Sequence, residues 1–190
     1  MNLDFWRSKM KELLDEELFL HSEGVAGAAR QLACSYGADG DKACLAGYLH
    51  DYGKRYSAKE LARLAAQMQV KIDPVSLKEP RLLHAPVGAL LLKRDLGLDD
   101  EDILTAVRFH TTGVPGMSLL DKILYLADYI EPGRDYEGVS EIRKLAENSL
   151  EQALLAAVDN TIRSVLRRGL LLHPDSVRFR NSILGLEYNE

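Results

Sequence analysis

The feature that most constrains this chain is that its apolar residues recur at helical spacing along almost the whole sequence. Apolar side chains three or four positions apart line one face of a helix, whereas a half-buried strand requires alternation with a period of two. No stretch shows sustained alternation of the β-branched and aromatic residues that strands favour. The sequence therefore predicts an all-α fold.

Local start and stop signals divide the chain into successive helices. Ser57 and Ser149 begin capping-box patterns, Ser118 begins another helix, and Gly53 is placed to adopt the left-handed conformation at a helix end. A loop is expected around Pro74 and Pro80. The predicted helices cover about 4–14, 22–36, 41–52, 57–69, 86–96, 100–110 and 118–131, two within 140–169, and a short one after 174.

Size and charge limit the protein classes that fit. A chain of 190 residues without repeats or a linker fits a single domain. Its net charge of -5 argues against extended nucleic-acid binding, and the charged runs 141–144 and 163–168 are expected to be solvated helix faces. The longest apolar run, 87–92, is too short for a membrane span. With no signal-peptide pattern and no C-x-x-C pair, a cytoplasmic protein without a thiolate zinc site is expected.

The histidines supply the first indication of chemistry. Four of the five fall at or near predicted helix ends, and one is followed directly by an aspartate. A single histidine is more often a packing residue than a ligand, but helices packed around one core can each direct one ligand to one point. Imidazole and carboxylate ligands suit Fe, Mn, Co, Ni or Zn. The residues in this series are His21, His50, Asp51, His84, His110 and Asp128.

Three longer stretches make the pattern specific. They are 49–54 (LHDYGK), 121–134 (DKILYLADYIEPGR) and 173–181 (HPDSVRFRN). Together they resemble the YqeK family of HD-domain metal-dependent phosphohydrolases, the symmetrical bis(5'-nucleosyl)-tetraphosphatases, over about residues 21–184. The resemblance implies an HD-domain helical bundle with additional C-terminal helices. In the implied single domain, 1–190, the metal-binding core covers about 18–135 and the helices in 136–190 complete the cleft.

The resemblance also implies a metal centre. Iron is the expected divalent ion, with Mn, Co or Ni as substitutes. Two further histidines, His84 and His110, either bind substrate phosphate or complete a second metal site, and the first alternative is favoured. The residues implied to hold the metal are His21, His50, Asp51 and Asp128.

Other residues of these stretches are expected to act on substrate. Asp51 can contact both metal and water, and the amine of Lys54, three residues later, can fold back over the same cleft as a catalytic and phosphate-binding group. The planar guanidinium of Arg134 can bind two phosphate oxygens. Glu131 is expected to orient Lys54, Arg134 or a ligand histidine. His173 is expected either to contact phosphate or to cap its helix.

The implied reaction is hydrolysis of dinucleoside tetraphosphates such as diadenosine tetraphosphate into two molecules of ADP, by attack of metal-bound hydroxide. The implied partners are this substrate and its nucleoside diphosphate product, with a homodimer left open and no membrane. Two alternatives remain at this point. One is another HD-domain activity, on deoxynucleotides or guanosine alarmones, and the other is a nucleotide-sensing module without turnover.

Overall fold

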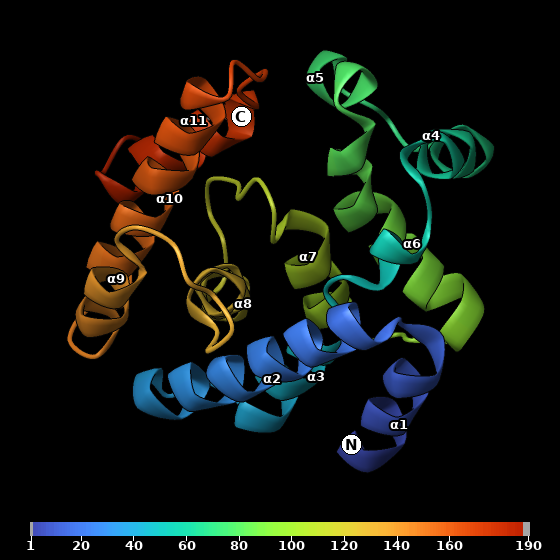
Figure 1. The fold of residues 1–190 in the computed structure, drawn as a ribbon, viewed down its shortest axis with the longest axis horizontal. Coiled ribbons are helices and arrows are strands. Elements are labelled where there is room, and N and C mark those ends of the chain that lie inside the picture. Colours follow the sequence, from blue (N-terminus) through green and yellow to red (C-terminus); the bar gives the residue numbers. More distant parts are fainter. Residues whose placement is uncertain (1, 188–190) are drawn as a thin grey trace.

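The computed structural model describes residues 2–187, which form helices and connecting turns and contain no strand (Figure 1). The all-α prediction is confirmed. No helix within this range is both long enough and apolar enough to span a bilayer. The elements are α1 (Leu3–Leu13), α2 (Glu16–Tyr36), α3 (Gly40–Leu49), η1 (Tyr52–Arg55), α4 (Ala58–Gln67), α5 (Pro74–Lys78), η2 (Pro80–Leu83), α6 (His84–Leu96), α7 (Glu101–Phe109), α8 (Leu119–Ile130), α9 (Val139–Ala146), α10 (Leu150–Arg167) and α11 (Pro174–Ile183).

Helix α8 lies at the centre of the fold, and Figure 1 shows it almost end-on. It packs against α2, α3, α7, α9 and α10. Its side chains Ile123, Leu124 and Leu126 are completely buried, as expected for a helix surrounded by others. Because Asp128 lies in the last turn of α8, the hydrophobic core fixes the position of this carboxylate.

The predicted helix starts agree with the structure where capping side chains mark them. At Ser57 and Ser118 both hydrogen bonds of the capping box are formed, and the Ser149 hydroxyl accepts the amide of Gln152. Each bond satisfies a backbone group that the helix itself leaves unpaired. These caps therefore define where α4, α8 and α10 begin.

Two of the differences from the predicted helices have a clear physical reason. Helix α2 begins at Glu16 behind the cap Asp15 and not at 22, so His21 lies within a helix and not at its end. The acidic residues at the start of α2 favour this earlier beginning through the helix dipole. The expected loop around Pro74 and Pro80 contains the short helices α5 and η2, because proline is compatible with a first helical turn.

Gly53 was predicted to adopt the left-handed conformation at a helix end, but the structure requires a glycine there for a different reason. It lies in η1 and is not among the glycines with positive φ. A Cβ atom at this position would lie 2.1 Å from the backbone carbonyl oxygen of His84. The glycine therefore permits η1 to lie directly against the start of α6, which brings the segment that follows Asp51 close to His84.

Candidate metal centre

Five helices bring six potential metal ligands to one place. His21 comes from α2, His84 begins α6, His110 follows α7 directly, and the others come from the end of α3 and from α8. Ligand atoms within each of three overlapping groups lie within 4.8 Å of one another. The structure therefore gathers the six predicted residues. The groups are His21, His50 and Asp51; His50, His110 and Asp128; and Asp51, His84 and His110.

Backbone contacts orient three of the imidazole rings. The Nδ1 atoms of His50, His84 and His110 lie 2.8, 2.6 and 2.7 Å from the carbonyl oxygen three residues earlier. Because a carbonyl oxygen only accepts hydrogen bonds, each Nδ1 must carry the proton and donate it. In the neutral ring the Nε2 atom is then left with a free lone pair, which is the arrangement of a metal-binding histidine.

These three Nε2 atoms and the Nε2 atom of His21 face one another in two pairs. Nε2 of His21 lies 3.2 Å from Nε2 of His50, and Nε2 of His84 lies 3.1 Å from Nε2 of His110. Two lone pairs cannot form a hydrogen bond, so each pair requires a proton or a cation close by. Both pairs are suited to bind positive charge.

The carboxylate of Asp51 lies between the two pairs. Its Oδ2 atom is 3.1 Å from Nε2 of His50 and 3.5 Å from Nε2 of His21, while its Oδ1 atom is 3.4 and 3.5 Å from Nε2 of His84 and His110. Asp51 is completely buried, and within the described part of the chain Oδ1 has no hydrogen-bond partner. A buried carboxylate oxygen without a partner is costly. This oxygen and the nitrogen and oxygen donors around it fit a divalent metal ion.

The electrostatics of the cluster favour bound positive charge. Burial raises the pKa of the carboxyls of Asp51 and Asp128, but the neighbouring histidines outweigh burial and hold both pKa values below the usual range. Burial lowers the pKa of His21, yet its contacts with Asp128 and Asp51 outweigh this and raise the pKa to about 9. Burial, reinforced by His110, lowers the pKa of His84 to about 4. Both carboxylates are thus ionised at neutral pH, beside neutral His84.

Three predicted polar residues surround the cluster. Lys54 Nζ lies 2.5 Å from Oδ2 of Asp51, so the lysine folds back as predicted. One Nη atom of Arg134 lies 2.5 Å from Oδ1 of Asp128. Glu131 Oε1 lies 3.2 Å from Nδ1 of His21 and 3.7 Å from Nε of Arg134, so it contacts two of its expected partners, a ligand histidine and Arg134. The side chains of Lys54 and Arg134 are 41% and 36% exposed, so both reach the surface beside the metal ligands.

His173 lies outside the three ligand groups. It is the N-cap of α11, where its Nδ1 atom accepts the amide of Asp175 at 3.2 Å. Its Nε2 atom lies 3.1 Å from Oδ2 of Asp73, the residue that caps α5. The predicted capping role is confirmed, whereas the phosphate contact stays a prediction.

The structure adds a supporting residue, Arg143, that sequence reasoning assigned to a solvated face. Its guanidinium donates to the backbone carbonyls of Ile130, Glu131 and Arg134 at 2.9, 2.7 and 2.9 Å. The interpretation of 141–144 as a solvated face is therefore wrong for Arg143. No local pattern could have shown this, because the three acceptors belong to the backbone of another segment.

A second missed residue is Thr111. Its hydroxyl lies 3.1 Å from Nε2 of both His84 and His110. Its position directly after His110 in the sequence is the one signal that could have indicated it. The hydroxyl can satisfy only part of the hydrogen-bonding capacity of this imidazole pair.

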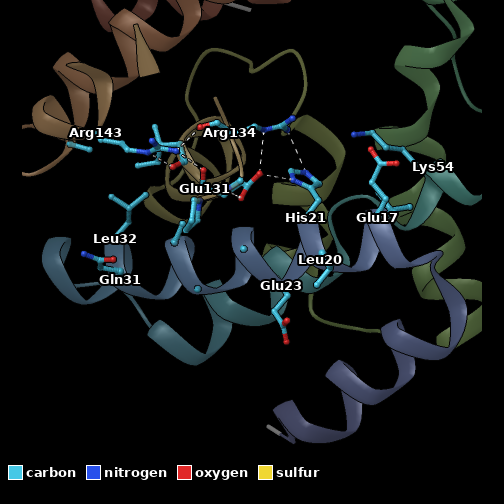
Figure 2. Close-up of a pocket in the computed structure, with 18 of the residues that line it drawn as sticks. Glu17, Leu20, His21, Glu23, Gln31, Leu32, Lys54, Glu131, Arg134 and Arg143 are labelled. Carbon is cyan, nitrogen blue, oxygen red and sulfur yellow. Dashed lines mark hydrogen bonds and ion pairs between the residues drawn. The ribbon is translucent and has the colours of Figure 1, made fainter. Parts of the chain in front are cut away.

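A groove of about 1300 Å³ opens beside the ligand cluster (Figure 2). His21, Lys54 and Arg134 line one part of it, and it continues along α2 to Leu32 and Ser35. Its wall opposite α2 is the turn after α8, which Arg143 supports. Of the six potential ligands, His21 lines this groove, so the groove reaches the edge of the ligand cluster.

Comparisons with known proteins agree with this site. The HD domain family model matches residues 18–133. The chain is 43% identical to the symmetrical bis(5'-nucleosyl)-tetraphosphatase of Bacillus subtilis, over 93% of this chain and 94% of that protein. It is 41% identical to the protein of the same name from Halalkalibacterium halodurans, over 92% and 93% of the two chains. A solved structure from Clostridium acetobutylicum, described as a predicted HD superfamily hydrolase involved in NAD metabolism, matches with a TM-score of 0.92 at 39% identity, over 97% of this chain and 98% of that one. The chain therefore belongs to the HD-domain family, and it shares nearly its whole length with relatives named symmetrical bis(5'-nucleosyl)-tetraphosphatases.

Proposed function

We propose that this protein is a metal-dependent hydrolase that cleaves dinucleoside tetraphosphates, such as diadenosine tetraphosphate, into two nucleoside diphosphates. The observation that carries the proposal is the buried carboxylate of Asp51, which lies between two imidazole pairs and next to Lys54. The names of relatives that align over nearly the whole chain support the substrate class.

Four residues would hold the principal metal ion. Iron is the proposed ion, with manganese, cobalt or nickel as substitutes, because nitrogen and oxygen donors without a thiolate suit these metals. The chemistry supplied by such an ion is Lewis acidity toward phosphate oxygens and a lowered pKa of water. His84 and His110 would bind substrate phosphate or, together with Asp51, a second ion. The four residues are His21, His50, Asp51 and Asp128.

The surrounding cations would hold the phosphate chain. Lys54 has three N–H donors and its contact with Asp51 uses one, so the others are free for phosphate oxygens. Arg134 uses its Nε and one Nη atom on Asp128 and retains further donors at the groove. Glu131 would hold the His21 ring in place through Nδ1. A phosphate contact from His173 stays a prediction from the sequence, because both of its ring nitrogens contact other residues, Asp175 and Asp73.

Symmetrical cleavage places the reacting bond in the middle of the tetraphosphate. The water oxygen bonds to one inner phosphorus, and the bridging oxygen leaves with the other inner phosphate, so each product is a nucleoside diphosphate. Asp51 Oδ1 would accept the proton of the attacking water, since this oxygen has no hydrogen-bond partner in the described chain. The neighbouring histidines keep this carboxylate ionised beforehand, and Lys54 donates a hydrogen bond to its Oδ2 atom.

We further propose that the chain acts as one domain. Its metal-binding core would cover about 18–135, and the helices in 136–190 would complete the cleft, with Arg143 as the direct connection. A cytoplasmic location and a homodimer stay predictions from the sequence.

The test is product chromatography after incubation of the purified protein with diadenosine tetraphosphate. Iron(II), manganese and cobalt are added separately, and a chelated sample serves as control. We expect metal-dependent formation of ADP alone. AMP together with ATP would refute symmetrical cleavage. An absence of product with each metal would contradict the proposed activity and favour a different HD-domain substrate or a nucleotide-sensing module.

A further inference from the structure

The groove beside the metal centre extends well beyond the residues proposed to hold phosphate. From His21 to Ser35 it follows one face of α2 over about 21 Å, at a rise of 1.5 Å per residue. Figure 2 shows Lys54 and Glu17 toward one end, with Gln31 and Leu32 toward the other. A ligand held at the metal centre thus has room to continue along α2.

The helix face beneath this extension has no side chain at one position, Gly27. Gly27 lies in the middle of α2 and lines the groove, and a Cβ atom at this position would have no neighbour within 4 Å. Gly24, one turn earlier, is different, because a Cβ atom there would lie 2.6 Å from Oε2 of Glu131. The space above Gly27 is therefore open, whereas the space above Gly24 is filled by the residue that orients His21.

The chemistry of the groove changes along its length. Lys54 and Arg134 supply positive charge directly beside the metal ligands, and Glu17 and Glu23 also line this part of the groove. Farther along, the guanidinium of Arg143 is engaged by three backbone carbonyls, and Glu147 adds negative charge, so a phosphate would be unfavourable there. That end offers the uncharged amide of the exposed Gln31, with the largely buried Leu32 forming the floor beside it. Apolar walls with a few polar groups are typical of sites for neutral organic ligands.

We infer that the groove over Gly27 is a subsite for one nucleoside of the substrate, with the ribose over the glycine and the base toward Leu32 and Gln31. The inference rests on the proposed function for the phosphate chain, which would extend from this nucleoside toward Lys54. The amide of Gln31 can donate to and accept from the edge of a base. The nucleoside subsite is thus separate from the residues that bind metal and phosphate, and substitutions can test it on its own.

The experiment measures binding of two probes to the manganese-loaded protein by calorimetry. ADP carries a nucleoside and two phosphates, whereas inorganic pyrophosphate carries the phosphates alone. Gly27→Phe fills the groove, Gly27→Ala adds only a methyl group, and Arg30→Phe places the same ring on an exposed position of α2 that does not line the groove. We expect Gly27→Phe to weaken ADP binding by about tenfold or more and pyrophosphate binding by less than about twofold. Arg30→Phe should bind both probes as the wild type does, and Gly27→Ala, whose methyl group enters the same space, should weaken ADP binding by less than Gly27→Phe does.

Replacement of a helical glycine favours the helix, so Gly27→Phe is expected to fold. Thermal unfolding of Gly27→Phe should occur at or above the wild-type temperature, which would separate loss of ADP binding from loss of structure. Unchanged ADP binding in Gly27→Phe, or equal weakening of both probes, would overturn the nucleoside subsite. If the wild type fails to cleave diadenosine tetraphosphate while Gly27→Phe still loses ADP selectively, the proposed activity is wrong and the subsite stands.

Discussion

At the scale of single residues, Asp51 has the most demanding environment in the described chain. It is completely buried, contacts four imidazole rings and has a lysine on one oxygen and no hydrogen-bond partner on the other. We predict that Asp51→Asn lowers turnover by more than about 100-fold, because the change removes the charge shared by both imidazole pairs and the proposed proton acceptor. Steady-state kinetics with added manganese measures this effect.

The matched control for Asp51 is Asp41→Asn. Asp41 makes an exposed ion pair with Arg30, so the same chemical change there should leave turnover within about twofold. Both variants should retain the helical circular dichroism spectrum. Turnover of Asp51→Asn close to that of Asp41→Asn would remove Asp51 from the reaction.

Two glycines on α2 permit a second test at this scale. Gly24→Ala places a Cβ atom against Glu131 Oε2, so the carboxylate whose Oε1 atom contacts Nδ1 of His21 must shift, whereas a Cβ atom in Gly27→Ala has no neighbour within 4 Å. We predict that Gly24→Ala weakens metal binding by about 10-fold, the usual size for loss of a residue that orients a ligand, and that Gly27→Ala does not. Titration with cobalt(II), followed by visible absorbance, compares the two. Equal affinities would show that the contact between Glu131 and His21 does not support metal binding.

At the scale of elements, the turn after α8 connects the metal centre to the C-terminal helices. Arg143 of α9 binds three of its carbonyls, and the same turn carries Glu131 and Arg134. We predict that Arg143→Ala lowers both cobalt affinity and thermal stability, with a stability loss of about 2 kcal/mol from the charged hydrogen bonds. Added guanidinium ions at low concentration should restore part of the cobalt affinity.

Lys144→Ala is the control for this element. Among residues 2–187, the Lys144 side chain makes only an exposed ion pair with Glu141 on the same helix, so its loss should change neither quantity measurably. If Arg143→Ala lowers stability but leaves cobalt affinity at the value of Lys144→Ala, the turn does not position the metal ligands.

The element boundaries show which structural features can be predicted from local signals in the sequence. The caps at Ser57 and Ser118 could be predicted because the partners lie three residues apart. Gly53 was assigned to a positive φ, but its role depends on the carbonyl of His84, thirty-one positions later. Local patterns therefore indicate where helices begin, while close approaches between distant segments require the folded chain.

At the scale of the whole molecule, a contact between His173 and Asp73 joins the caps of α11 and α5. Burial raises the pKa of Asp73, but hydrogen bonds from Ser76 and the contact with His173 outweigh it and hold the pKa below its usual range. A carboxyl with a depressed pKa stabilises the fold above the ordinary aspartate value of about 3.9 and loses this contribution as the pH falls below it.

Asp73→Asn tests this contribution, since asparagine can still cap α5 but carries no charge. We predict that the wild type unfolds at a higher temperature than Asp73→Asn at pH 7, and that the difference shrinks as the pH falls from 5 to below the ordinary aspartate pKa. Scanning calorimetry across this range follows the difference. A difference that is constant with pH would show that the ionised carboxylate does not stabilise the contact.

The arrangement of the whole molecule explains which features of the metal site could be predicted from the sequence and which could not. The six predicted ligands could be chosen because their residue types and their distribution over separate helices are visible in the sequence. The central position of Asp51 between two imidazole pairs, and the support from Arg143, depend on how five helices and a distant turn pack. Such packing has no local pattern, and these features therefore appear only in the folded structure.

The central claim is that water attacks an inner phosphorus at the Asp51 centre and yields two identical products. Hydrolysis of diadenosine tetraphosphate in water enriched in oxygen-18, followed by mass spectrometry, tests this directly. We predict ADP alone, with one of every two molecules carrying a single heavy oxygen on its β-phosphate, and formation of this product more than about 100-fold slower with Asp51→Asn. Heavy oxygen in AMP or ATP, or labelled ADP from Asp51→Asn at the wild-type rate, would contradict the account.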